Sequence, residues 1–196
     1  IEQFANRTDA NDFAVEIISE RDKYTKVFQN VSGTKTAVVS ATPIHYETEN
    51  GWENIDNTLI EFNEITGKVY KNKNNDFTTT IPKELSSNKK VQIEKEGYSL
   101  SFELVGTDVF SKSKKIKGTK KSKSRKHQVL ENGVETDFLD KTSAVSFENV
   151  GENTSVEYAV TSTGLKENII LNKKPASEVT YKYIINAKKL NATLNK

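Results

Sequence analysis

Cysteine and methionine are both absent from the 196 residues of the chain, and only two histidines occur. Without cysteine there is no disulfide, no thiolate zinc site and no cysteine nucleophile. The two imidazoles, His45 and His127, stand in no G-x-S-x-G or H-E-x-x-H motif, so the sequence supports neither a catalytic triad nor a metal site. We therefore predict no catalytic residue and no metal ligand, and we expect that the chain is not an enzyme.

Glycine and long hydrophobic runs are also scarce. The nine glycines form neither a phosphate-binding loop nor a dinucleotide fingerprint, so no cofactor is predicted. No window approaches the roughly 18 consecutive apolar residues that a membrane-spanning helix needs, so we expect no membrane insertion. The chain opens IEQFANRTDANDF, without an initiator methionine or the apolar region of a signal peptide, and we interpret it as a piece of a longer protein.

Alternation of apolar and polar side chains with a period of two dominates what is present. It is clear in YSLSFEL, SVEYAV and VTYKYII, whose apolar positions are β-branched or aromatic and suit a half-buried sheet. Turn signals at Asn50-Gly51, Gly67 and Gly97 separate such runs. The pattern predicts an all-β fold, an antiparallel β-sandwich of about a dozen strands. The expected boundaries are a polar lead-in at 1–12, a single domain at 13–190 and a tail at 191–196.

Acidic residues are missing from one segment, 111–127, which holds eight lysines and one arginine. Its low complexity predicts a long, flexible basic loop inserted in the middle of the sandwich. An alternative is contact with a polyanion. No aromatic residue is interleaved with these charges, so no specific nucleic acid is predicted as a partner. The side chains proposed for polyanion contact are Lys114, Lys115, Lys120, Lys121 and Arg125.

The segment PIHYETENGWENIDNTL, 43–59, contains the only tryptophan, Trp52. Trp52, Tyr46 and His45 are candidates for an aromatic sugar-binding platform, with Asp56 as an acidic partner. The alternative is that Trp52 packs in the core, because alternation places Ile44 and Tyr46 on one face and His45 on the other. Asp56 or Glu53 could also supply one of the two carboxyl groups of a glycosidase. For Asp56 the alternative is hydrogen bonding to the backbone of a turn. Core packing and turn formation are the favoured interpretations.

Three stretches resemble one family of proteins. They are SERDKYTKVFQNVSGTKTAVVSATPIHYETENGWENIDNTL, then IPKELSSNKKVQIEKEGYSLSFELVG, then SVEYAVTSTGLKENIILNKKPASEVTYKYII, and together they cover most of residues 19–186. The matching features are P-I-H-Y, a short turn and G-W-x-x-I-D-N-T-L, followed downstream by G-L-K-E-x-I-I-L. They resemble the β-rich region of large secreted RHS/YD-repeat proteins of Gram-positive bacteria, including wall-associated proteins that carry DNRLRE modules.

This resemblance implies a secreted, cell-wall-associated protein and a structural or adhesive module that spaces or docks its neighbours. The expected partners are neighbouring domains of the same polypeptide and, as an alternative, cell-wall polysaccharide. The parent proteins deliver toxins between competing bacteria, and no catalytic residue is associated with this region. The resemblance also implies that Trp52, Ile55, Asp56, Asn57 and Leu59 mark the fold. We predict that GWENIDNTL is a central strand, with Trp52 and Leu59 in the core and with Asp56 and Asn57 fixing an adjacent turn. A carbohydrate-binding module and a polyanion-binding module remain the alternative functions.

Overall fold

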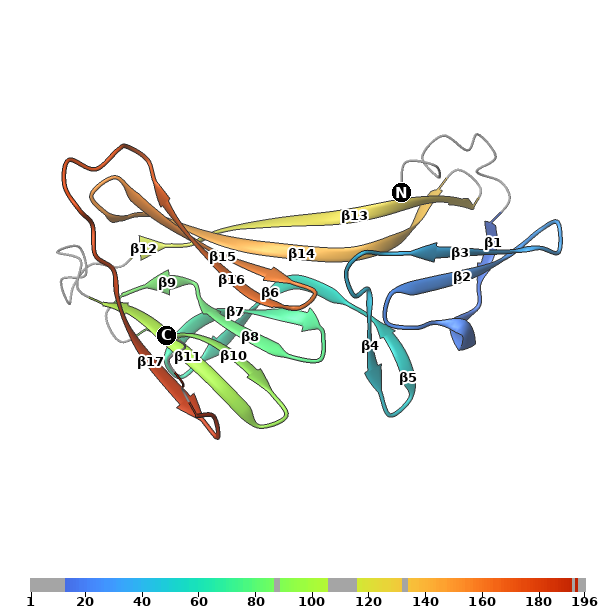
Figure 1. Cartoon of the computed structure of the whole chain (residues 1–196), viewed down its shortest axis with the longest axis horizontal. Coiled ribbons are helices and arrows are strands. Elements are labelled where there is room, and N and C mark those ends of the chain that lie inside the picture. Colours follow the sequence, from blue (N-terminus) through green and yellow to red (C-terminus); the bar gives the residue numbers. More distant parts are fainter. Residues whose placement is uncertain (1–12, 87–88, 106–115, 132–133, 192, 194–196) are drawn as a thin grey trace. The chain divides into compact units, whose positions relative to one another are not determined.

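The computed structural model describes residues 13–86, 89–105, 116–131, 134–191 and 193 (Figure 1). Within this part of the chain the paired strands run antiparallel, and the helical content is one 3-10 turn, Ile18–Glu20. The prediction of an all-β, antiparallel fold is therefore confirmed. The predicted lead-in, 1–12, and most of the predicted tail, 191–196, lie outside the described residues.

The chain divides into two compact units, whereas the sequence predicted a single domain over 13–190. Unit 1 comprises Ile1–Ile55 and Ser124–Lys141, and unit 2 comprises Asp56–Lys123 and Thr142–Lys196. The division cuts through the two longest strands, β13 (Thr119–Glu131) and β14 (Val134–Gly151), each of which contributes residues to both units. A strand shared in this way leaves no change of composition at the boundary that a sequence could reveal.

Unit 1 contains a three-stranded sheet and a separate hairpin. In β2 the residues alternate strictly, and Lys26, Phe28 and Asn30 are the buried ones. Lys26 is only 1% exposed, and its ammonium lies 3.6 Å from a carboxylate oxygen of Glu16, which also accepts two hydrogen bonds from Arg21. The strands of the sheet, in order, are β1 (Phe13–Glu16), β2 (Thr25–Asn30) and β3 (Lys35–Val39), and the hairpin is β4 (His45–Thr48) with β5 (Gly51–Asn54).

Unit 2 contains most of a ten-stranded antiparallel sheet. It also contains the two-stranded sheet that β9 and β12 form. The order of hydrogen-bonded neighbours is β16-β15-β14-β6-β7-β8-β10-β11-β17, and β13 pairs with β14. The remaining bounds are β6 (Asp56–Glu64), β7 (Gly67–Asn74), β8 (Thr78–Pro82), β9 (Glu84–Leu85), β10 (Val91–Lys95), β11 (Tyr98–Val105), β12 (Ile116–Lys117), β15 (Thr154–Thr161), β16 (Gly164–Leu171) and β17 (Lys182–Lys188).

The large sheet of unit 2 folds over on itself and encloses a core in the manner of a sandwich. The rings of Phe102 in β11 and Tyr158 in β15 are 5.8 Å apart, although β14, β6, β7, β8 and β10 separate these strands in the sheet. Tyr158 also packs edge-on against Phe147 at 6.1 Å. Side chains from both halves of the sheet thus share one hydrophobic cluster, which is the layer packing expected of an antiparallel sheet with one buried face.

Glycines with positive φ close several of the hairpins, as the sequence predicted at Gly67 and Gly97. The predicted turn at Asn50-Gly51 is also present, shifted by one residue. Thr48 pairs with Gly51, so Glu49 and Asn50 form the loop and Gly51, at φ +101°, begins β5. Glu64 and Gly67 pair in the same way around Ile65 and Thr66. A left-handed residue after a two-residue loop fits the twist of the flanking strands, and glycine adopts it without steric cost.

The basic segment 111–127 is not the loop that its composition predicted. Its described part, from residue 116, lies in strands β12 and β13. Between these strands, Gly118 donates its N–H to the carbonyl of Lys83 and lies against the buried side chains of Val145 and Phe147. Because β13 pairs with β14 alone, it is an edge strand. Lysine on an edge strand keeps a second chain from pairing there, so a lysine-rich strand is physically reasonable.

We predicted that GWENIDNTL forms one central strand, and this prediction is wrong. Gly51–Asn54 is β5 of the hairpin in unit 1, and Asp56–Glu64 is β6 of the large sheet in unit 2. Leu59 is 1% exposed and belongs to the core, as predicted. Trp52 is only half-buried and is not a core residue, because a two-stranded hairpin has too little surface to enclose an indole.

Candidate functional site: the Trp52 hairpin and a lysine-lined groove

The hairpin β4–β5 does not bring Trp52 and Tyr46 together on one face. Tyr46 is paired with Glu53, and Trp52 is paired with Glu47. Directly paired residues share a face, and successive residues along a strand point to opposite faces. Tyr46 therefore lies on the face opposite Trp52, and its hydroxyl donates to the Glu53 carboxylate over 2.9 Å. The two rings predicted to form a sugar platform do not form one.

His45 is completely buried, so no ligand can reach its ring. Its Nδ1 lies 2.6 Å from the carbonyl oxygen of Asp22, and its Nε2 is buried without a hydrogen-bond partner. Burial lowers the pKa of His45 below its ordinary value, and the positive charges of Arg21 and Lys26 add to this effect. The arrangement holds a neutral imidazole inside unit 1. Its position in a predicted sugar platform is therefore corrected to a structural one.

Asp56 and Asn57 both fix turns, and Asn57 does so over a long distance. One carboxylate oxygen of Asp56 accepts the N–H of Thr58 at 3.0 Å, which is the turn-forming role that the sequence favoured. Asp56 is 8% exposed, and its second oxygen lies 3.5 Å from the ammonium of Lys73. Asn57 is fully buried, and its amide donates to the carbonyl of Thr161 at 2.9 Å. Neither side chain is free to act on a substrate.

Around Asn57 the structure assembles an amide network that the sequence did not predict. The Asn57 oxygen accepts hydrogen bonds from Asn72 at 3.3 Å and from Asn75 at 3.1 Å. Asn72 also donates to the carbonyl of Phe77, and its oxygen accepts from the N–H of Thr79 at 2.7 Å. The network ties β6, β7 and β8 to the turn after β15. Three asparagines spread over 19 positions carry no local pattern that would reveal this contact.

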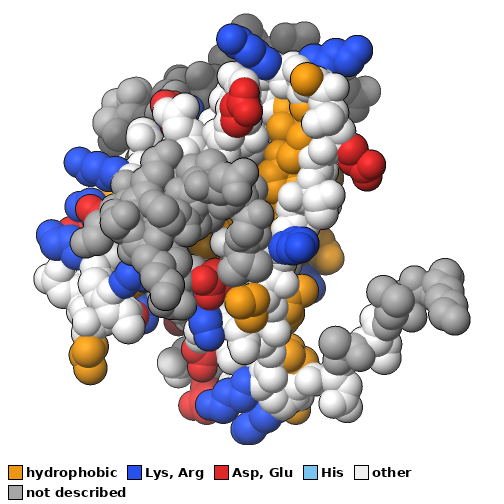
Figure 2. All heavy atoms as spheres, turned by 90° about the vertical axis from the view of Figure 1, so that its left-hand side faces the viewer, with side chains coloured by type: hydrophobic (Ala, Val, Ile, Leu, Met, Phe, Trp, Pro, Cys, Tyr) orange, Lys and Arg blue, Asp and Glu red, His pale blue; other side chains and the backbone are white. Residues whose placement is uncertain are grey.

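The side chains predicted for polyanion contact do not form a described patch. Lys120 donates to the carbonyl of Leu59 at 2.9 Å, and its ammonium lies 5.8 Å from the ring centre of Tyr70. Lys121 is exposed. Lys114 and Lys115 lie outside the described residues, as does the side chain of Arg125. Figure 2 shows basic side chains spread around the end of unit 2 that it faces. Charge alone therefore does not single out a surface.

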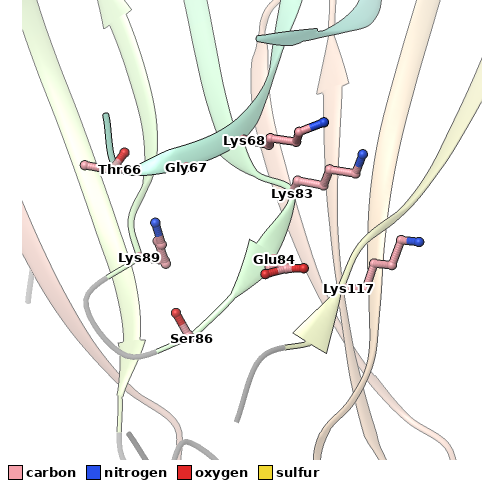
Figure 3. A pocket seen from close by; sticks show the side chains of 8 residues that line it. All are labelled: Thr66, Gly67, Lys68, Lys83, Glu84, Ser86, Lys89 and Lys117. Carbon is pink, nitrogen blue, oxygen red and sulfur yellow. The ribbon is translucent and has the colours of Figure 1, made fainter. Parts of the chain in front are cut away.

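One lysine-rich groove in unit 2 was missed by the sequence interpretation. It has a volume of about 400 Å³ and lies beside the turn between β6 and β7 (Figure 3). Its walls come from that turn and the start of β7, from β9 and the residues on either side of it, from the segment just before β10, and from the end of β12. The signal was present in GKVYK, IPKEL and SNKK, but only the fold brings these stretches together. The lining residues are Thr66, Gly67, Lys68, Lys83, Glu84, Ser86, Lys89 and Lys117.

Two of the four lysines share one acid. Glu61 accepts hydrogen bonds from Lys68 at 2.8 Å and from Lys83 at 2.5 Å. These two hydrogen bonds lower the pKa of Glu61 to about 2, and the same contact raises the pKa of Lys83. Glu61 therefore stays ionised and holds both ammonium groups in place at ordinary pH.

A second cavity in unit 2, of about 550 Å³, lies between the β14–β15 turn and the connection from β16 to β17. Its charged lining side chains are Lys173, Lys174, Glu152 and Glu178, so positive and negative charges balance there. This cavity selects no ligand by charge, in contrast to the groove. The part of the chain that the structure describes contains no cluster of three or more metal-ligating side chains and no helix long and apolar enough to cross a membrane.

Comparisons of the chain with protein-family models, with curated proteins and with solved structures found no match.

Proposed function

We propose that the chain is a non-catalytic structural module of a large secreted, cell-wall-associated RHS-type protein, where it spaces or docks neighbouring modules. The observation that carries the proposal is that the motif GWENIDNTL, which resembles that family, has a structural role in this fold. Ile55, Asp56, Asn57 and Leu59 are all buried, at 8% exposure or less. Asp56 and Asn57 use their polar groups on turns of the same unit. The motif thus builds the fold, and no substrate is needed to explain its chemistry.

The arrangement of acids supports the same proposal. Glycoside hydrolysis needs two carboxyl groups facing each other across a cleft, about 5–10 Å apart. Glu53 is bonded to Tyr46 on an exposed hairpin, and Asp56 is committed to Thr58 and Lys73. A carbohydrate-binding module is less favoured, because Tyr46 and Trp52 face opposite sides of their hairpin.

The test uses the full-length parent protein and measures its surface display and resistance to protease. A structural module requires the fold, so Asn57→Ala is expected to reduce both. Trp52→Ala and Glu53→Gln, which leave the core of unit 2 intact, are expected to leave both unchanged. Loss of display with Trp52→Ala in a protein that still folds would overturn the proposal in favour of carbohydrate binding. Loss with Glu53→Gln would point to catalysis.

A further inference from the structure

The groove beside the β6–β7 turn concentrates positive charge. Four lysines and one glutamate line it, so its lining carries a net charge of +3. Glu61 pairs with Lys68 and Lys83, which leaves Lys89 and Lys117 without an ion pair among the described residues. Clefts lined by one sign of charge focus the field and attract ligands of the opposite sign. The groove is therefore suited to an anion.

Lys89 is the lysine best placed to bind it. In Figure 3 its ammonium ends beside Gly67, whereas the side chains of Lys68, Lys83 and Lys117 all point to the other side, away from Lys89. The Lys89 ammonium is 3.3 Å from the point where a Cβ on residue 67 would lie, so it lies close to the backbone of the β6–β7 turn. Lys89 is half-buried, and its backbone N–H is bonded to the carbonyl of Ser86. The backbone of Lys89 is thus fixed at the groove, and its ammonium has no acidic partner among the described residues.

The cations in the groove are all lysines, with no arginine among them. Arginine presents a planar fork that holds a carboxylate or a phosphate by two hydrogen bonds, whereas lysine acts as a compact point charge and is a common phosphate ligand. Ser86 adds a hydroxyl donor to the lining. Several lysines along one groove suit a ligand with more than one negative charge.

The apolar side chains beside the groove do not favour a membrane as the source of the phosphate. Ile65, at the tip of the turn, is fully exposed, and Ile60 and Phe62 on β6 are 40% and 45% exposed. Glu61 lies between these two in the sequence, and the ammonium of Lys71 is 5.8 Å from the ring centre of Phe62. A membrane-binding surface needs a wider apolar area that charged side chains do not interrupt.

We propose that the groove lined by Lys68, Lys83, Lys89 and Lys117 binds the phosphate groups of a soluble phosphate polymer. Lys89 makes the central contact, and Lys68 and Lys83 are held by Glu61 at the groove wall. Glu84 also lines the groove and opposes the bound anion. This site differs from the basic segment 111–127 as a whole, because three of its four lysines lie outside that segment.

The experiment measures the affinity of the whole chain for inorganic polyphosphate by isothermal titration calorimetry at low salt. Lys89→Gln is expected to weaken binding by about tenfold, as loss of one charge-assisted contact does. The matched control, Lys90→Gln, removes the same charge one residue away, outside the groove, and is expected to change the affinity by less than about twofold. Glu84→Gln removes an opposing charge and is expected to strengthen binding.

Three results would overturn the proposal. The first is that polyphosphate does not bind. The second is that Lys89→Gln and Lys90→Gln weaken binding equally, since that indicates only a general attraction by charge. The third is binding to vesicles of phosphatidylglycerol and phosphatidylcholine in place of polyphosphate, with loss of binding in Ile65→Ser. The thermal midpoint of each variant shows that it is folded. None of these results depends on the wall-associated role proposed above, so the two proposals can fail separately.

Discussion

Asn57 illustrates how one buried side chain can serve as donor and acceptor at once. Its NH2 group donates to the carbonyl of Thr161, and its oxygen accepts from Asn72 and Asn75. A neutral amide carries two N–H donors and a separate acceptor oxygen, so it can do both, which neither an ionised aspartate nor a leucine can. A buried polar group left without partners costs free energy, so each member of such a network depends on the others.

Asn57→Ala is expected to lower the free energy of unfolding of unit 2 by about 2–4 kcal/mol, because it leaves the Thr161 carbonyl and two amides without their partner. Urea denaturation followed by far-UV circular dichroism measures the change. The matched control is Asn63→Ala on the same strand, where the side chain is exposed, and a change within about 0.5 kcal/mol is expected there. Equal effects of the two substitutions would show that the network does not stabilise the fold.

His45 shows why alternation can fail at the start of a strand. Ile44 and His45 are consecutive and both fully buried. The backbone N–H groups of both residues bond to the carbonyl of Lys23, at 2.9 and 3.3 Å, so the chain enters β4 through a loop contact and not in regular pairing. Alternation predicts that Ile44 and His45 lie on opposite faces of the strand, whereas the structure buries both side chains. Asp56 was predicted correctly because its turn is local, within two residues.

The pKa of His45 predicts how the stability of unit 1 depends on pH. Burial lowers this pKa in the folded protein, so the unfolded chain binds a proton more readily. The contribution of neutral His45 to the free energy of unfolding is therefore expected to be fully present above the ordinary histidine pKa of about 6.5. It is expected to fall as the pH drops below that value. Urea midpoints from Trp52 fluorescence at pH 7.5 and 5.5 measure the fall, and His45→Asn should flatten it.

The other histidine provides the comparison for this pH effect. If His127→Asn flattens the dependence and His45→Asn does not, the assignment to His45 is wrong. Glu16 titrates in a lower range. Burial raises its pKa, but the hydrogen bond from Arg21 and the charge of Lys26 outweigh this, so its pKa is lowered overall. Its contribution is present above the ordinary glutamate pKa of about 4.5 and is lost only at more acidic pH.

At the scale of elements, the sequence predicted hairpins well and predicted the basic segment badly. Gly67 and Gly97 mark turns because a positive φ is a local requirement that glycine meets at once. The lysines of β13 predicted a flexible loop instead of a strand. A lysine-rich composition indicates a solvated segment, but it does not specify which strand pairs with that segment. The pairing partner of β13 is β14, and the contacts of Gly118 with Val145 and Phe147 are equally non-local.

Gly118→Ala tests whether the basic segment is docked on the core of unit 2. A Cβ at residue 118 would lie 2.5 Å from a methyl of Val145 and 2.7 Å from the ring of Phe147, both fully buried. Overpacking of this kind costs about 1–3 kcal/mol, so the thermal midpoint is expected to fall by several degrees. Lys121→Ala, three residues away and exposed, is the control and should leave the midpoint unchanged. A mobile loop would tolerate both substitutions equally.

For the whole molecule, the division into two units could not be read from the sequence. The chain passes between the units at three points, after Ile55, Lys123 and Lys141. None of them carries a proline or a glycine, and only the point after Lys123 lies in a low-complexity segment. Strand β13 continues through one of these points and β14 through another. Compact units of this kind are defined by which distant residues meet, and local patterns specify strands without specifying their partners.

The only tryptophan makes this division testable, because Trp52 belongs to unit 1 while the core cluster with Tyr158 belongs to unit 2. Arg21 donates to the carbonyl of Trp52 at 3.2 Å and to both oxygens of Glu16. Arg21→Ala should therefore lower the free energy of unfolding of unit 1 by about 1–3 kcal/mol, because it leaves the half-buried carboxylate of Glu16 without its main partner. The change is measured as a lower urea midpoint in Trp52 fluorescence.

Under the same conditions Asn57→Ala should move the transition seen by circular dichroism and leave the Trp52 transition in place. Lys35→Ala, which breaks an exposed ion pair with Glu20, is the control for Arg21→Ala and should move neither transition measurably. If Arg21→Ala and Asn57→Ala shift both signals together, the shared strands β13 and β14 make unfolding a single cooperative event. In that case the chain would behave as the one domain that its sequence predicted.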